Sequence, residues 1–123
     1  MMSPNTSEIG RLGERAVAAW LRRQGFDLLE TNWRNGRYEI DLIACKAGEL
    51  HIVEVKARRA GGLTEPEAAL TLRKQQALLQ AARSYVSWRR WPGEVRFDLA
   101  AVDLFPDGRS EVRWIPDAVQ CHW

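Results

Sequence analysis

The sequence has little cysteine and no long hydrophobic run. Its two cysteines, Cys45 and Cys121, lie far apart and belong to no CxxC pattern. This spacing excludes a disulfide scaffold and a structural zinc motif, and it favours two reduced thiols. The longest unbroken apolar run is the six residues Ala16–Leu21, whereas a bilayer-spanning helix needs about 20. We therefore expect no membrane association.

The chain also lacks a targeting segment and a dominant sign of charge. Residues 1–8 have neither the basic nor the apolar part of a secretory signal, so we expect a cytoplasmic protein. Lys and Arg number 18 and Asp and Glu 16, a net charge of +2. That balance does not by itself indicate nucleic-acid binding, so the distribution of the charges must be examined.

Lysine is scarce within the basic set. There are 15 arginines and only three lysines, Lys46, Lys56 and Lys74. Because an ammonium and a guanidinium are not interchangeable in a tight site, these three positions are candidates for specific roles.

The length of 123 residues, with 46% apolar and 28% charged residues, predicts one globular domain over residues 1–123. Periodicity and capping signals predict helices at Thr6–Gln24 and Thr64–Trp88. Strands are expected at Phe26–Trp33, Tyr38–Ala44, Leu50–Ala57, Val95–Leu104 and Glu111–Ile115. This order predicts an α/β fold, with a mixed central sheet flanked by helices, because the second helix allows a parallel crossover.

The signals at the helix ends are specific. Asn5 or Thr6 caps the first helix, Gly25 ends it, and Thr64-Glu65-Pro66-Glu67 forms a capping box for the second. On the first helix, Glu14 lies one turn from both Gly10 and Ala18, beside small residues that another element can approach closely.

Two adjacent strands carry acidic residues and a lysine. If the hairpin is symmetric about Ala47-Gly48, paired positions sum to 95, so Asp41 faces Glu54 and Glu39 faces Lys56. Directly opposed residues have Cβ atoms about 5 Å apart. Two carboxylates that close repel each other unless one is protonated or a cation lies between them.

The residues around this pair are apolar: Ile40, Leu42, Ile43, Ile52, Val53 and Val55. Because uncompensated buried charge is costly, the pattern favours a hard divalent cation, Mg²⁺ or Mn²⁺, between Asp41 and Glu54. Lys56, on the same face as Glu54, would then orient or activate a water for attack on a phosphodiester. The alternative is a solvent-exposed salt-bridge ladder.

Basic residues flank these strands and would form a rim able to hold phosphates: Arg34, Arg37, Lys56, Arg58 and Arg59. Arg58 and Arg59 begin a flexible loop and are equally explained as solvated loop residues. Lys74, on the second helix, is either a contact for nucleic acid or a surface lysine.

The stretch Ser87–Trp91 interleaves aromatic and basic residues. Base stacking is one explanation, and packing of Trp88 and Trp91 on the core is favoured.

Four segments together resemble the UPF0102 family of small bacterial proteins: Gly13-Glu14, Glu39-Ile40-Asp41-Leu42-Ile43-Ala44, Val53-Glu54-Val55-Lys56 and Arg96-Phe97-Asp98. That family is similar to the archaeal Holliday junction resolvases of the restriction-endonuclease-like PD-(D/E)XK superfamily. The resemblance covers about residues 7–103 and implies a restriction-endonuclease-like αβββαβ core. It also implies a Mg²⁺-dependent (or Mn²⁺-dependent) endonuclease that acts on DNA, with branched or structured DNA as the expected substrate, as a homodimer.

The resemblance implies a role for each matching residue. Asp41 and Glu54 would be metal ligands, with the backbone carbonyl of Val55 as a third ligand and Glu14 as an additional carboxylate from the first helix. Lys56 would be the catalytic lysine. Lys74 is similar to a basic position that faces the active centre.

The chain departs from the family pattern at Tyr38, where the family usually has glycine before the Glu-Ile-Asp triplet. Gly36 would then provide the turn, and the bulky ring of Tyr38 would narrow the entry to the site. This departure and the modest net charge favour an alternative function, a non-catalytic nucleic-acid-binding or adaptor protein that retains the fold. A third alternative is a partner-binding module that uses Trp88, Trp91 and Trp123.

Overall fold

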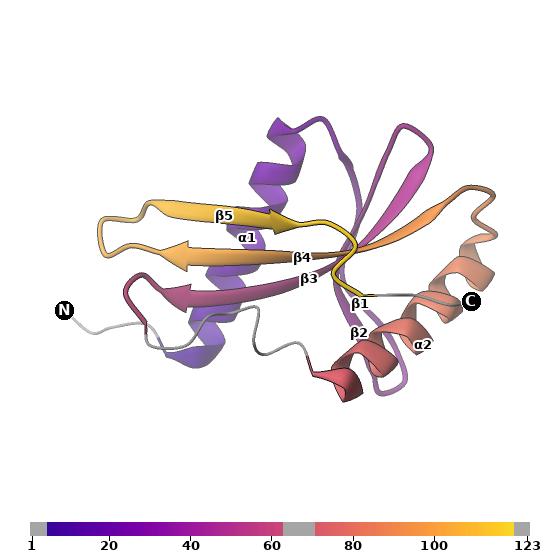
Figure 1. Cartoon of the computed structure of the whole chain (residues 1–123), viewed down its shortest axis with the longest axis horizontal. Helices are drawn as coiled ribbons and strands as arrows, with labels where there is room; N and C mark the ends of the chain where they lie inside the picture. Colours follow the sequence, from indigo (N-terminus) through magenta and orange to yellow (C-terminus); the bar gives the residue numbers. More distant parts are fainter. Residues whose placement is uncertain (1–4, 63–70, 120–123) are drawn as a thin grey trace.

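The computed structural model describes residues 5–62 and 71–119 (Figure 1). Its elements follow one another in the order α-β-β-β-α-β-β, as the sequence predicts. They are α1 (Thr6–Arg23), β1 (Asp27–Asn35), β2 (Tyr38–Lys46), β3 (Glu49–Arg59), α2 (Leu72–Arg89), β4 (Val95–Leu104) and β5 (Ser110–Ile115). The α/β class with an αβββαβ core is confirmed.

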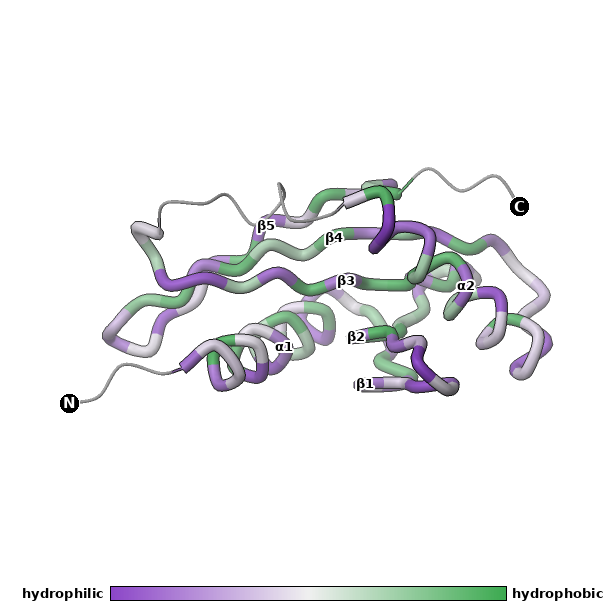
Figure 2. The backbone as a smooth tube through the Cα atoms, turned by 90° about the horizontal axis from the view of Figure 1, so that it is seen from below, coloured by the Kyte–Doolittle hydropathy of each residue, from purple (hydrophilic) through white to green (hydrophobic). Residues whose placement is uncertain are grey.

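The five strands form one mixed sheet in the order β1-β2-β3-β4-β5. β3 and β4 are parallel, and the other neighbours are antiparallel. The parallel pair needs a crossover, which α2 provides. Figure 2 shows the strands from β5 at the top to β1 at the bottom, with α1 on one side of the sheet and α2 on the other. The predicted mixed sheet flanked by helices is therefore confirmed.

Each helix has its own apolar core, and β3 contributes to both through strand alternation. Leu50 and Ile52 pack in the cluster that contains α2. Val53 and Val55 pack in the cluster that contains α1. Along β3, the next side chains on the same face as Leu50 and Ile52 are those of Glu54 and Lys56, which are polar residues of the predicted site. That site therefore lies on the α2 side of the sheet.

The ends of the helices are determined by capping side chains. The Asn5 side chain accepts a hydrogen bond from the Glu8 N–H at 2.9 Å, and Gly25 follows α1 with φ +88°. Both features confirm the prediction for α1. α2 begins at Leu72, later than predicted, because Thr71 is its N-cap and accepts from the Lys74 N–H at 3.2 Å. The capping box predicted at 64–67 lies outside the described residues.

The β2–β3 hairpin has the predicted register. Its pairs run from Lys46–Glu49 to Leu42–Val53, and every pair sums to 95. The two turn residues, Ala47 and Gly48, both have positive φ, as the tight turns of two-residue hairpins require. The local sequence pattern therefore predicts the register correctly because the turn leaves no freedom for a shift.

The prediction of a flexible loop at Arg58 and Arg59 is wrong. Both residues belong to β3, which continues its parallel pairing with β4 as far as Arg59 and Leu104. The Arg58 Nε donates to Asp103 Oδ1 at 2.7 Å, so a cross-strand ion pair holds this end of the sheet together.

The tryptophans divide between packing and exposure. Trp91 packs against the α2 core, and Trp114 stacks on Trp20 with ring centroids 5.3 Å apart. Trp88 is 67% exposed and contacts Trp33 and Tyr85, so its predicted role as a core cover is wrong. Trp123 lies outside the described residues. Among the described helices, none is long and apolar enough to cross a bilayer.

Candidate functional site

The candidate site lies where β2 separates from β3. The backbone pairing stops at Leu42–Val53, and the Asp41 carboxylate then accepts the Val55 N–H at 2.9 Å. Side-chain alternation also changes here, because Ile40 packs with the α2 core and Leu42 with the α1 core. The Asp41 side chain therefore accepts the hydrogen bond of a β3 backbone N–H at the point where the two strands diverge.

Asp41 and Glu54 lie close enough for each carboxyl group to shift the pKa of the other. Burial raises the pKa of both, and the charge of Asp41 helps to raise the pKa of Glu54 to about 7, against the opposing effect of Lys56. Two ionised carboxyl groups this close repel each other unless one is protonated or a cation lies between them. The pair therefore binds a proton near neutral pH, and a cation is able to take the place of that proton.

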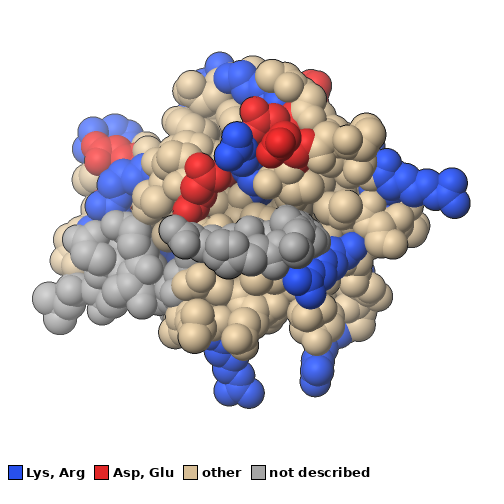
Figure 3. All heavy atoms as spheres, turned by 45° about the vertical axis from the view of Figure 1, so that its right-hand side comes forward, with Lys and Arg blue, Asp and Glu red and all other residues tan. Residues whose placement is uncertain are grey.

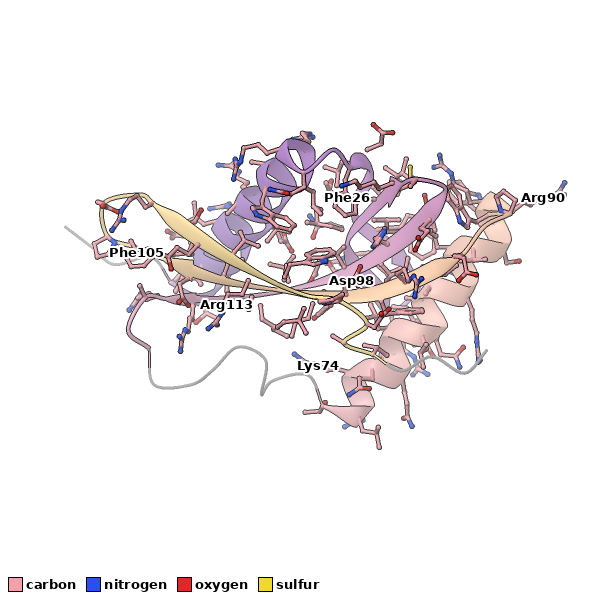
Figure 4. All side chains as sticks on the ribbon, turned by 45° about the horizontal axis from the view of Figure 1, so that its top comes forward. Phe26, Lys74, Arg90, Asp98, Phe105 and Arg113 are labelled. Carbon is pink, nitrogen blue, oxygen red and sulfur yellow. The ribbon has the colours of Figure 1, made fainter. Side chains whose placement is uncertain are left out.

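A pair of lysines lies beside the carboxyl groups. Lys56 Nζ is 3.4 Å from Glu54 Oε1, and both side chains are 18% exposed. Burial alone would lower the pKa of Lys56, but its interactions with Lys74 and with the charge of Glu54 outweigh burial and raise that pKa. The interaction with Lys56 lowers the pKa of Lys74, so Lys74 is the first of the two to lose its proton. Figure 4 shows Lys74 extending from the first turn of α2.

The predicted pairing of Glu39 with Lys56 is wrong. Glu39 is the register partner of Arg34 in the β1–β2 ladder, and the Arg34 Nη2 lies 3.5 Å from Glu39 Oε2. Glu39 pairs with β1 because the ladder between β2 and β3 has already ended at this position.

Glu14 approaches the acidic centre from α1. It is half-buried, and burial together with the charge of Asp41 raises its pKa. The close approach that brings it there occurs at Gly13, where an added Cβ would overlap the Cβ of Ala57 on β3. Of the two small residues beside which we predicted a close approach, Ala18 is buried in the α1 core, whereas no atom lies within 4 Å of a Cβ added at Gly10.

Sequence reasoning missed Asn32 on β1. Its side chain lies beside Glu14 and acts to lower the pKa of that carboxyl group against the effect of burial, and the register pairs Thr31–Leu42 and Trp33–Ile40 place it across from Asp41. Its φ of +49° lies in the left-handed region, which asparagine tolerates better than most residues. An asparagine in a strand, where this residue is depleted, is the signal that could have identified it.

Gly13→Ala is expected to destabilise the protein by about 2 kcal/mol, because the overlap with Ala57 outweighs the gain in helix propensity. Urea denaturation would measure the change. The double variant Gly13→Ala/Ala57→Gly removes the overlapping atom and should recover part of the loss. A double variant no more stable than Gly13→Ala alone would contradict the packing argument.

The oxygen donors fit Mg²⁺ or Mn²⁺ in kind, because Mg²⁺ is commonly held by one or two carboxylates together with waters. Asp41 and Glu54 supply that pair. Over residues 5–62 and 71–119, no three His, Cys, Asp or Glu side chains are gathered closely enough to hold a metal ion. Glu14 therefore stands outside the pair in this arrangement.

The predicted basic rim is only partly assembled. Lys56 belongs to the centre and Lys74 joins it, whereas Arg58 is engaged with Asp103 and Arg34 with Glu39. Arg59 is exposed at the end of β3, and Arg37 lies over the Tyr38 ring at 5.4 Å. Figure 3 shows basic side chains spread around the face drawn, with smaller acidic groups beside some of them.

A second polar pair lies apart from these residues. His51 Nδ1 is 2.6 Å from Asp98 Oδ2, and Asp98 is 2% exposed. The other oxygen of Asp98 accepts the Asp117 N–H at 3.0 Å. The acidic residue of the Arg96-Phe97-Asp98 segment therefore ties β3 and β4 to the segment after β5.

The third lysine is also explained. Lys46 Nζ donates to the Gln24 carbonyl at 2.7 Å, at the C-terminal end of α1, and lies over the Phe26 ring. A cation is favourable at a helix C-terminus, so Lys46 has a structural role.

The fold and the site define an α/β protein with a carboxylate–lysine centre at the divergence of two antiparallel strands. The chain belongs to the UPF0102 family, whose family model, described as an uncharacterised protein family, matches residues 13–102. A UPF0102 protein of Porphyromonas gingivalis is 40% identical over 80% of this chain and 73% of its own length. One from Bacteroides thetaiotaomicron is 38% identical over 91% of this chain and 92% of its own length. One from Chlorobium chlorochromatii is 39% identical over 85% of this chain and 81% of its own length.

Proposed function

We propose that this protein is a Mg²⁺-dependent endonuclease that hydrolyses phosphodiesters in branched or structured DNA. The observation that carries the proposal is the half-buried Asp41–Glu54 pair with the Lys56 ammonium 3.4 Å from Glu54. Clustered carboxyl groups with raised pKa values beside a lysine are typical of catalytic centres. The resemblance to the resolvases supports DNA as the substrate, a homodimer as the active form and the cytoplasm as the location.

The proposed roles of the residues combine their positions with the resemblance to the resolvases. Asp41, Glu54 and the backbone carbonyl of Val55 would hold Mg²⁺, with Glu14 as an additional carboxylate at the side. When bound, the ion would neutralise charge that develops on the phosphoryl oxygens. Lys56 Nζ, kept charged by its neighbours, would donate a hydrogen bond to the attacking water or to a phosphoryl oxygen. Lys74 would contact the phosphate backbone from the α2 side.

The test is cleavage of branched and linear DNA by the full chain, with Mg²⁺ and with EDTA. We expect cleavage by the wild type in Mg²⁺ alone and a loss of it in Asp41→Ala and Lys56→Ala. Lys46→Ala removes the same charge at the far end of the hairpin and serves as the control. Undiminished cleavage in both site variants would contradict the assignment.

A second candidate is a nucleic-acid-binding or adaptor protein without catalytic activity. It is favoured by the finding that the described residues offer no group of three metal-ligating side chains. The Lys56 ammonium, 3.4 Å from Glu54, is also able to balance the one negative charge of the singly protonated Asp41–Glu54 pair without a metal. Saturable DNA binding that needs no metal and leads to no cleavage would select this candidate.

A further inference from the structure

A groove of about 680 Å³ lies between α2 and the start of β2, outside the acidic centre. Its polar lining comes from Arg37, Tyr38, Arg73, Gln76, Gln80 and Arg83. No acidic residue lines it within the described part of the chain. The groove is therefore a basic and amide-rich surface, in contrast to the carboxyl-rich centre.

The α2 wall is organised by helical spacing. Arg73, Gln76, Gln80 and Arg83 recur at intervals of three and four residues, so they follow one face of the helix. From Arg73 to Arg83 the helix rises about 15 Å, a length that spans several phosphates of one nucleic-acid strand. All four side chains are exposed.

The β2 wall brings an aromatic ring and a third guanidinium. Arg37 lies over the Tyr38 ring at 5.4 Å, and its Nη2 donates to the Tyr38 hydroxyl at 3.4 Å. Gly36, with φ +62°, forms the turn that precedes them. Tyr38, which replaces the glycine usual in the family, is thus part of the groove wall.

The groove borders the candidate site on both walls. Tyr38 is three residues before Asp41 in β2, about 10 Å along the strand. Arg73 directly precedes Lys74, which lies close enough to Lys56 for that residue to lower its pKa. A strand that passes Lys56 and Lys74 would therefore meet the guanidinium groups of the groove next.

We propose that this groove binds the sugar–phosphate backbone of one DNA strand as it leaves the acidic centre. Guanidinium groups bind phosphates with two parallel hydrogen bonds, and Gln76, Gln80 and Tyr38 offer further donors to backbone oxygens. Binding of this kind is independent of sequence. The choice of DNA as ligand rests on the proposed function.

The experiment measures binding of the full chain, in EDTA, to a fluorescent single-stranded oligonucleotide and to the duplex of the same sequence. Arg73→Gln/Arg83→Gln is expected to raise Kd by about tenfold or more at low salt and to reduce the salt dependence by about two phosphate contacts. Arg37→Gln, on the other wall, should weaken binding to both probes. The control Arg22→Gln/Arg23→Gln removes two exposed charges from the last turn of α1 and should change Kd much less.

The outcomes separate this inference from the proposed function. If the groove variants lose affinity and the wild type does not cleave DNA, the groove stands and the nuclease assignment fails. If the wild type cleaves but the groove variants bind like the wild type, the groove assignment fails. Three further results would overturn the groove assignment. They are an equal loss of DNA affinity in the groove and control variants, a loss of affinity confined to the duplex, and no saturable binding by the wild type.

Discussion

Glu54→Gln is expected to remove most of the pH dependence of stability between pH 5 and pH 8. In the folded protein the pKa of Glu54 is raised from 4.5 to about 7. Between these values the folded state holds a proton that the unfolded state has released, so stability falls as pH rises. The wild type should lose about 2 kcal/mol across this range, whereas glutamine, which resembles the protonated acid, should lose much less.

Urea denaturation at a series of pH values would measure this difference. Glu49→Gln is the matched control, because Arg96 lowers the pKa of Glu49 and the residue stays ionised throughout the range. Under the proposed function, Mg²⁺ should restore stability to the wild type at pH 8 and have little effect on Glu54→Gln. A Glu54→Gln variant that loses as much stability as the wild type would show that Glu54 does not hold the proton.

If the proposed function is correct, Asp41→Asn is expected to lower Mg²⁺-dependent cleavage by roughly 10³-fold while the fold is retained. The amide oxygen of the substituted side chain can still accept the Val55 N–H that Asp41 accepts at 2.9 Å, but the negative charge for the metal is lost. Asp41→Ala loses both and leaves the Val55 N–H without its partner. We therefore expect Asp41→Ala, unlike Asp41→Asn, to be about 1–3 kcal/mol less stable than the wild type.

Single-turnover cleavage together with urea denaturation would separate these two effects. Asp107→Asn, in the exposed turn before β5, is the control for loss of one carboxylate. Cleavage by Asp41→Asn at the wild-type rate would remove Asp41 from the catalytic centre. Equal destabilisation by the asparagine and alanine variants would instead contradict the role of the Asp41 oxygen as the partner of Val55.

The sequence by itself determined the order of the elements and the register of the central hairpin. The signals for α1 are local, since Asn5 caps it and Gly25 ends it. The two-residue turn at Ala47-Gly48 permits a single register, so the pairing of β2 with β3 follows from counting residues. The same counting predicts that Asp41 and Glu54 lie near each other, although the ladder itself ends one pair earlier, at Leu42–Val53.

Only the tertiary structure decided how the strands diverge and what gathers at that point. Because β2 turns away from β3 at Asp41, Glu39 forms its ion pair with Arg34 on β1. Lys56 forms its ion pair with Glu54 instead of Glu39. The closeness of Gly13 to Ala57, the contact of Lys56 with Lys74 and the groove beside Tyr38 each join segments far apart in the sequence. Such contacts depend on how helices and sheet pack together, and residue spacing within one segment carries no information about that packing.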